Sequence, residues 1–196
     1  MTLIIALKDE NNKKIYLGAD RQGTQGDMSY DNFGCKLLKI EIPLIDDNGI
    51  DEIYMAFSGS SFLHQYILNV FQAPVFDINT NFMNYLYRSF FKELRDELKE
   101  QNLIKKDNEI FDAECGLIII HKENIYSVWF DLSITESPRN YAVHGAGYKN
   151  AVSIVENLLE FHNDLDYKEI MKEVLYTTGK MNIYCNTDYD ILTIEY

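Results

Sequence analysis

Residues 1–24, MTLIIALKDENNKKIYLGADRQGT, hold two short apolar runs on either side of a polar one. The runs at 2–7 and 15–19 are rich in aliphatic and β-branched residues, and the KDENNKK between them is typical of a wide turn. This stretch therefore predicts a β-hairpin with Thr2 at the head of its first strand. Removal of Met1 would leave Thr2 with a free amine beside its own hydroxyl, so one residue would offer both a base and a nucleophile.

The composition of the chain excludes several classes of protein. With 196 residues, of which 46% are apolar, it can bury one sizeable core, and we expect a single domain over residues 1–196. The net charge of −13 repels phosphate backbones, so nucleic acid is not an expected partner. No signal peptide and no apolar run of membrane-spanning length is recognisable, which favours a cytoplasmic location without a membrane partner. The cysteines form no CxxC pair, which argues against a disulfide framework or a zinc site: Cys35, Cys115 and Cys185.

The rest of the chain alternates blocks of strands with blocks of helices. Apolar and β-branched runs predict strands at 35–42, 52–57, 115–121, 125–130 and 141–147, and a last strand pair within 182–196. Apolar residues at helical spacing predict helices at 61–72, 80–100, 149–161 and 167–178. Because the elements come in pairs rather than in βαβ alternation, the order favours antiparallel sheets covered by helices, an α+β architecture. Two stacked sheets between two helical layers accommodate every segment, although periodicity alone leaves other stackings open.

Two charged residues stand where the predicted hairpin brings them toward Thr2. Asp20 ends the second strand of the hairpin, so it returns beside the start of the first strand. A third strand that carries Lys36 would add an ammonium group between them. A lysine held against a hydroxyl and a carboxylate can have its pKa tuned and can help to move the hydroxyl proton. The structural alternative is a turn aspartate, a surface lysine and a threonine at a common second position.

These segments resemble the opening of the proteasome β-subunit and HslV-type peptidases, which are N-terminal-nucleophile threonine hydrolases. The similarity lies in TLIIAL, IYLGADRQGT, CKLLKI and YMAFSGSS, and the spacing of Asp20 and Lys36 agrees with that of the family. It returns near the end of the chain in AVHGAGYKNAVSIVENLLE and TTGKMNIYCNTDYDILTIEY. Residues 61–112 match by helical pattern alone. The resemblance implies a four-layer αββα sandwich and a threonine-type endopeptidase that hydrolyses unfolded polypeptides.

The resemblance also assigns roles to matching positions. Thr2 falls at the nucleophile that removal of Met1 exposes, and Asp20 and Lys36 fall at the residues that orient and activate it. Gly59 falls at the turn whose backbone N–H stabilises the oxyanion. Substrate contacts are implied at four further positions: Gly23, Thr24, Ser58 and Ser60.

The resemblance carries expectations about cofactors and partners as well. In some relatives, backbone carbonyls hold a monovalent cation or magnesium, and the matching positions here are Gly179, Asn182 and Cys185. No other cofactor is expected. The family implies a homo-oligomeric ring, a peptide or unfolded protein as substrate, and an ATPase unfoldase as a further partner.

One position departs from the family pattern. The serine of the family's Gly-Ser-Gly turn, which hydrogen-bonds near the threonine amine, aligns with Ala146 in HGAGY. Loss of one such hydrogen bond removes about 1–3 kcal/mol of local organisation, or roughly ten- to a hundredfold in rate. We therefore expect a weakened site, unless His144 or Tyr148 supplies the missing hydrogen bond.

Other functions stay open from the sequence alone. One alternative is a non-catalytic structural or assembly subunit of the same fold, which intact mass would help to distinguish because an active enzyme should lack Met1. Another is an N-terminal-nucleophile amidase for a small amide, which would change only the substrate. FSGSS at 57–61 lacks the first glycine of a serine-hydrolase elbow, and GAGY at 145–148 lacks the lysine and serine of a phosphate loop. The histidines show no metal-binding spacing and are expected to be structural or exposed: His64, His121, His144 and His162.

Overall fold

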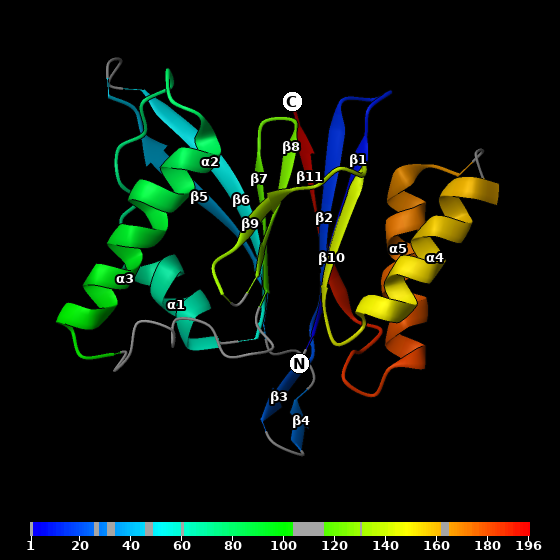
Figure 1. Cartoon of the computed structure of the whole chain (residues 1–196). Helices are drawn as coiled ribbons and strands as arrows, with labels where there is room; N and C mark the ends of the chain where they lie inside the picture. The colour runs from blue at the N-terminus through cyan, green and yellow to red at the C-terminus, as the bar shows by residue number, and fades with distance from the viewer. Residues whose placement is uncertain are drawn as a thin grey trace.

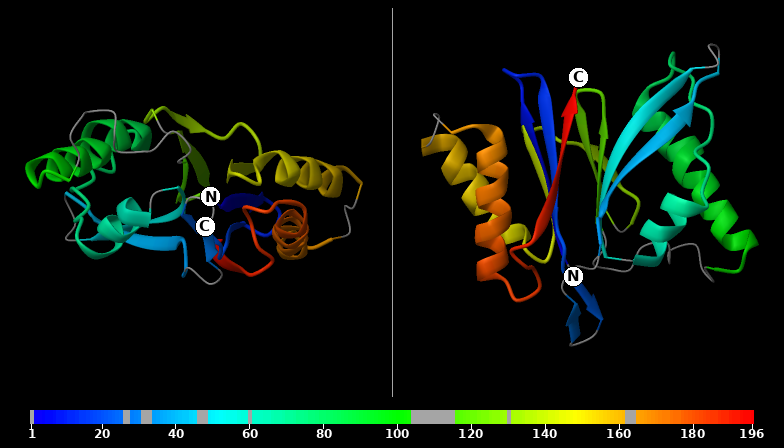
Figure 2. Two further views of the ribbon diagram at one scale, coloured as in Figure 1. Left: turned by 90° about the horizontal axis from the view of Figure 1, so that it is seen from below. Right: turned by 180° about the vertical axis from the view of Figure 1, so that it is seen from behind.

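Two antiparallel β-sheets stack face to face, and helices cover the outer face of each sheet (Figure 1). The structure is a computed structural model that describes residues 2–25, 28–30, 34–45, 49–59, 61–103, 116–129, 131–161 and 165–196. The view from behind shows the same succession of helices, sheet, sheet and helices (Figure 2). The layered α+β architecture expected from the sequence is confirmed. Among the helices of the described residues, none combines the length and the apolar character needed to cross a bilayer.

The first sheet brings together strands from both ends of the chain. Its order is β10-β1-β2-β11, with antiparallel neighbours throughout. The strands are β1 (Leu3–Asp9), β2 (Lys14–Asp20), β10 (Tyr141–Gly145) and β11 (Tyr189–Glu195). Ile4 pairs with Ala19, which is the hairpin that residues 2–19 predict. The residue before β1 and the last residue of β2 therefore lie at the same end of the sheet.

The second sheet has the order β5-β6-β7-β8-β9 and is also antiparallel. Its strands are β5 (Leu37–Pro43), β6 (Ile50–Ser58), β7 (Gly116–His121), β8 (Asn124–Trp129) and β9 (Ile134–Glu136). A separate small ribbon of β3 (Gly23–Gln25) and β4 (Met28–Tyr30) projects beyond the sheets beside the N-terminal end of the chain (Figure 1).

Helices from two parts of the chain form the outer layers. The second sheet is covered by α1 (Ser61–Asn69), α2 (Phe82–Tyr85), a π-helical segment η1 (Leu86–Phe90) and α3 (Phe91–Glu100) (Figure 1). The first sheet is covered by α4 (Tyr148–Phe161) and α5 (Tyr167–Met181). These are the two helix pairs that the apolar spacing predicts.

Strand β1 is buried on both faces, which explains its continuous apolar sequence. Leu3, Ile5 and Leu7 pack toward α4 and α5, whereas Ile4 and Ala6 pack between the two sheets. A strand with one solvated face would alternate apolar and polar residues instead. Fully burying one large aliphatic side chain contributes about 1.5–3 kcal/mol. The strand that follows Thr2 is therefore firmly anchored.

The structure corrects the sequence-based elements at three places. The predicted helix at 80–100 is interrupted by η1, because an apolar stripe does not reveal a local change of helical pitch. The strand pair predicted within 182–196 is wrong, since β11 is its one strand and pairs with β2. Three short strands, β3, β4 and β9, have only three residues each and carry no readable alternation.

Candidate active site

Thr2 and Asp20 meet at one end of the first sheet. The β1–β2 register places the end of β2 beside the residue that precedes β1. Thr2 Oγ1 donates a hydrogen bond to Asp20 Oδ1, and the backbone N–H of Leu3 donates to the same oxygen at 2.9 Å. Thr2 is 3% exposed and Asp20 is 1% exposed. The hydroxyl and the carboxylate thus form a buried pair that both strands hold in register.

Lys36 completes this pair from the second sheet. It immediately precedes β5, and its Nζ donates hydrogen bonds to Thr2 Oγ1, to Asp20 Oδ1 at 2.9 Å and to the carbonyl oxygen of Gln22 at 2.7 Å. An ammonium group has three N–H donors, so these three oxygens use all of them. Burial lowers the pKa of Lys36, and the negative charge of Asp20 opposes that shift. The result is a buried lysine whose charge is compensated by one carboxylate.

The loop between α5 and β11 holds the other side of Asp20. The backbone N–H of Asn186 donates to Asp20 Oδ2 at 3.2 Å, so both carboxylate oxygens accept hydrogen bonds. The side-chain amide of Gln22 donates to the carbonyl of Ile183 at 2.9 Å. Arg21 forms an ion pair with Asp190 at the start of β11. Sequence reasoning did not find the contacts with Asn186 and Ile183, because these residues act through backbone groups more than 160 residues away, which leave no sequence motif.

The turn after β10 packs directly on the main chain of Thr2. The backbone N–H of Ala146 donates to the carbonyl oxygen of Thr2 at 2.7 Å. Gly145 has φ +100°, and a Cβ there would overlap the carbonyl oxygen of Thr2 and lie 2.9 Å from Ser58 Oγ. Only glycine combines this backbone conformation with such a close approach. Because β1 lies between β10 and β2 in the sheet, this turn flanks Thr2 on the side opposite to Asp20.

Five positions are expected to bind the oxyanion or substrate, and the structure describes four of them near Thr2. Gly59 follows β6 directly, is exposed and has φ +112°. Ser58 is the last residue of β6 and is 3% exposed, so it is almost closed to a substrate in this structure. Gly23 and Thr24 open β3, next to the carbonyl of Gln22 that holds Lys36. Ser60 lies outside the described residues.

Neither residue considered as a replacement for the missing serine forms a hydrogen bond with Thr2 within the described part of the chain. His144 is 4% exposed and lies against the ring of Trp129, with centroids 4.5 Å apart. Its Nε2 has no hydrogen-bond partner among the described residues, and burial lowers the pKa of His144 to about 4. Tyr148 begins α4 and is exposed. The hydrogen bond that Ala146 cannot form is not made by these two side chains.

The positions matched to the cation site lie at the end of α5 and in the loop after it. Gly179 is in the last turn of α5, and a Cβ there would overlap the carbonyl oxygen of Asn186. The carbonyl of Asn182 accepts the N–H of Cys185 at 3.0 Å, which closes a tight turn. Burial raises the pKa of the Cys185 thiol to about 12, and magnesium and monovalent cations prefer oxygen to sulfur ligands. A cation here would have to be held by main-chain oxygens.

The other described histidines, His64 and His121, pack against aromatic rings. His64 packs against Phe57, and His121 stacks on Phe82 and pairs with Asp51 at 2.9 Å. His162 lies outside the described residues.

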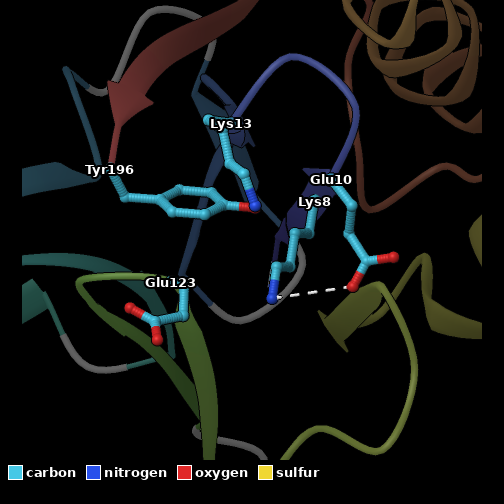
Figure 3. Close-up of a pocket in the computed structure, with 5 residues that line it drawn as sticks. All are labelled: Lys8, Glu10, Lys13, Glu123 and Tyr196. Carbon is cyan, nitrogen blue, oxygen red and sulfur yellow. Dashed lines mark ion pairs between the residues drawn. The ribbon is translucent and has the colours of Figure 1, made fainter.

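A pocket of about 520 Å³ at the end of the sandwich opposite to Thr2 is lined by charged side chains and one tyrosine (Figure 3), namely Lys8, Glu10, Lys13, Glu123 and Tyr196. Lys8 pairs with Glu10 there at 3.9 Å.

The fold, two stacked antiparallel sheets between helices, is that of solved HslV-type structures. Among solved structures, eukaryotic HslV from Trypanosoma brucei matches with a TM-score of 0.66 and 17% identity over 100% of both chains. BPH from Thiobacillus denitrificans matches with a TM-score of 0.70 and 16% identity, covering 99% of this chain and 98% of that one.

Sequence comparison points to the same family. The chain is 28% identical over 196 residues to the ATP-dependent protease subunit HslV of Aliarcobacter butzleri, covering 99% of this chain and 97% of the relative. It is 25% identical over 195 residues to the same subunit of Campylobacter jejuni (strain RM1221), covering 99% and 96%. No family model matches the sequence. The full-length similarity confirms the resemblance of this chain to the HslV-type family.

Proposed function

We propose that this chain is a threonine peptidase of the HslV class that hydrolyses peptide bonds of unfolded polypeptides through Thr2. The observation that carries the proposal is the hydrogen-bonded contact of the Thr2 hydroxyl with both Lys36 Nζ and Asp20 Oδ1 at the head of β1. A threonine with a purely structural role at a strand end has no need of a buried lysine and a buried carboxylate. Full-length similarity to subunits named as ATP-dependent proteases supports the same activity.

The proposed reaction uses the two functional groups of Thr2 after Met1 has been removed. The freed amine takes the proton of Oγ1 while Oγ1 attacks the carbonyl carbon of the substrate. The N–H of Gly59 donates to the oxyanion that forms. The C–N bond then breaks, the leaving amine takes up the proton, and an ester on Thr2 remains. Water hydrolyses that ester and regenerates the hydroxyl.

Lys36 and Asp20 act on the hydroxyl rather than on the substrate in this scheme. As an ammonium group, Lys36 stabilises negative charge that develops on Oγ1, and Asp20 keeps the lysine charged and in place. A lysine that has lost one proton could instead accept the proton of Oγ1, and its lowered pKa makes that state more accessible. The amine is the better candidate because the charged lysine already satisfies all three of its oxygen partners.

The assembly proposed for this chain is a homo-oligomeric ring in the cytoplasm that encloses the Thr2 sites. Enclosure would restrict cleavage to unfolded chains that can enter, and an ATPase unfoldase would be the partner that feeds them. The support is the similarity to relatives named as subunits of an ATP-dependent protease.

A cation at the end of α5 is a secondary part of the proposal. The last four carbonyls of a helix lack intrahelical partners, and Gly179 belongs to them. The carbonyl of Asn182 keeps one lone pair after accepting the N–H of Cys185. A monovalent cation or magnesium held there, with the carbonyl of Cys185, would fix the loop that donates to Asp20. Raised melting temperature with potassium or magnesium chloride, but not with choline chloride, tests this site independently of activity.

Hydrolysis of a fluorophore-labelled casein by the protein lacking Met1 tests the activity. We expect turnover by the wild-type chain and none by Thr2→Ala, with the circular dichroism spectrum unchanged. Hydrolysis of small amides without casein cleavage would favour the amidase alternative. A correctly processed chain that hydrolyses neither would favour a non-catalytic subunit.

A further inference from the structure

We propose that the side chain of Asn182 is a positioning group for Thr2, on which it acts through the turn at Ala146. The inference rests on the proposed function, because the residue that Asn182 helps to hold is the proposed nucleophile. The side-chain amide has this role, and it is separate from the main-chain carbonyl of Asn182 that a cation would use. A series of hydrogen bonds leads from this amide to the main chain of Thr2.

The peptide unit between Thr2 and Leu3 is held at both of its polar groups. Its N–H, on Leu3, donates to Asp20 Oδ1 at 2.9 Å, and its carbonyl oxygen, on Thr2, accepts the N–H of Ala146 at 2.7 Å. The second contact continues the β1–β10 pairing one residue past Gly145, which pairs with Leu3. Because a peptide unit is planar, these contacts fix the plane from which the Thr2 Cα projects, with its amine and its side chain.

Asn182 holds the turn that makes the contact with the Thr2 carbonyl. Its Nδ2 donates to the carbonyl oxygen of Ala146 at 2.8 Å. Ala146 thus donates to Thr2 with its N–H and accepts from Asn182 with its carbonyl, although its methyl side chain forms no hydrogen bond. At the position of the family's serine, the link to Thr2 therefore runs through the main chain, and the Asn182 side chain secures that main chain.

Asn182 is itself fixed within the loop between α5 and β11. Its backbone N–H donates to the carbonyl of Thr178 at 3.0 Å, and its Oδ1 accepts the N–H of Tyr184 at 2.9 Å. The acceptor end of the side-chain amide is thus used inside the loop, and the donor end is directed at Ala146. An aspartate would offer oxygens at both ends and would place a negatively charged oxygen against the carbonyl oxygen of Ala146.

The same loop supports the other side of the Thr2–Leu3 peptide unit. The backbone N–H of Asn186 donates to Asp20 Oδ2 at 3.2 Å, and Asp20 in turn accepts the N–H of Leu3. Two contacts four residues apart in this loop therefore act on the two polar groups of one peptide unit. Loss of the Asn182 contact leaves the Asp20 contact in place, so we expect Thr2 to be misoriented while its buried cluster persists.

Two substitutions at position 182 distinguish this role from that of an ordinary turn residue. Asn182→Asp keeps the acceptor for the Tyr184 N–H and loses the donor to Ala146, whereas Asn182→Ala loses both. If Asn182 positions Thr2, both variants should lower kcat for labelled casein by about ten- to a hundredfold with little change in KM. If it only closes the turn, Asn182→Asp should keep the wild-type kcat. Asn182→Ala introduces no charge, so a fall in both variants is not an effect of the added carboxylate.

The matched control is Asn79→Asp, on the far side of the second sheet's β5 from Lys36. Asn79 is exposed, and its Nδ2 donates to Asp77 Oδ1 at 3.0 Å, so this variant also turns an amide donor into a carboxylate that faces an oxygen. Its loop follows Phe76, whose N–H donates to the carbonyl of Pro43 at the end of β5. Asn79→Asp should leave kcat and KM unchanged, and circular dichroism of each variant verifies folding.

Amide hydrogen exchange, followed by mass spectrometry, detects the contact without turnover. In the peptide that covers residues 142–148, exchange should be faster in both position-182 variants than in the wild type, and unchanged in Asn79→Asp. Unchanged exchange in the position-182 variants, or a wild-type kcat in Asn182→Asp, would overturn the proposal. A wild-type chain without turnover, whose position-182 variants still exchange faster, would reject the peptidase function and keep the contact of Asn182 with the turn.

Discussion

Lys36 donates hydrogen bonds to three oxygens in the buried cluster. After Thr2, it is the residue whose substitution we expect to lower peptidase activity most. Lys36→Met keeps the aliphatic stem and removes the charge, which leaves Asp20 as a buried carboxylate without its cation. We expect loss of peptidase activity and a fall of about 3–5 kcal/mol in the free energy of unfolding, measured by urea denaturation.

The matched control for that change is three residues along the chain. Lys39 pairs with Glu52 on the surface, where both side chains are well exposed. Lys39→Met should change the free energy of unfolding by less than about 1 kcal/mol and leave activity intact. Equal effects of the two substitutions would mean that the Lys36–Asp20 pair is no more important than a surface ion pair.

His144 makes the stability of the protein depend on pH. Burial lowers its pKa to about 4 in the folded protein, against about 6.5 for an unfolded chain. Between pH 6.5 and pH 4 the unfolded chain therefore binds a proton that the folded chain does not, and the free energy of unfolding decreases as the pH falls. We expect His144 to account for about 2–3 kcal/mol of that decrease, at 1.36 kcal/mol per pKa unit.

Urea denaturation of His144→Phe at several pH values isolates this contribution. Phe keeps an aromatic ring beside Trp129 and does not titrate. The variant should lose less stability than the wild type between pH 6.5 and pH 4, even if it is less stable at pH 8. An identical pH slope would show that other groups, such as the buried His121, cause the decrease.

At the scale of residues, the sequence predicts a neighbour of Thr2 where a single hairpin determines the distance between two positions. Asp20 was placed near Thr2 because a hairpin has one register that keeps both apolar strands buried. Lys36 needed the family resemblance, since its sheet is separate from that of Thr2. Asn186 and Gln22 were missed because they act through a backbone N–H and a backbone carbonyl. Main-chain groups are present at every position and give no sequence signal.

At the scale of elements, the turn after β10 presses on the strand that begins at Thr2. Gly145→Ala should disturb Thr2 through two effects, the strain of φ +100° and overlap with the Thr2 carbonyl oxygen. Gly34→Ala is the matched control, because Gly34 has φ +110° with nothing within 4 Å of the added Cβ. Gly34→Ala should cost about 1–2 kcal/mol of strain, measured by urea denaturation, and keep activity.

Comparing these two substitutions separates the effect of backbone strain from the effect of overlap with the Thr2 carbonyl oxygen. Gly145→Ala should cost clearly more stability than Gly34→Ala and should abolish casein hydrolysis. Similar losses for both substitutions would mean that the overlap with Thr2 relaxes without consequence, and the turn would then not hold Thr2 in place.

The elements themselves were largely predictable, and their failures have physical causes. Strands buried on both faces, such as β1 and β7, appear as uninterrupted apolar runs. The interruption of the helix by η1 preserves an apolar stripe, so hydrophobic spacing cannot detect it. Alternation within 182–196 predicts a strand in the loop after α5, yet Ile183 and Tyr184 are exposed there. An apolar residue in a sequence does not have to be buried.

At the scale of the whole molecule, the proposed function requires more than one chain. Native mass spectrometry of the purified protein should show a ring-sized homo-oligomer at micromolar concentration, and Thr2→Ala should form the same species. A stable monomer at that concentration would contradict the proposed peptidase, because its sites would then be open to folded proteins.

The central claim is that Thr2 is the nucleophile once its amine is free, and covalent labelling tests it most directly. The protein is treated with a peptide epoxyketone, which requires both the hydroxyl and the amine of the same residue, and its intact mass is measured. The account predicts that chains lacking Met1 gain the mass of one inhibitor on Thr2, and that chains retaining Met1 and the Thr2→Ala variant gain none. The account would be contradicted if chains that lack Met1 gain no inhibitor mass and if the Thr2→Ala variant hydrolyses casein at the same rate as they do.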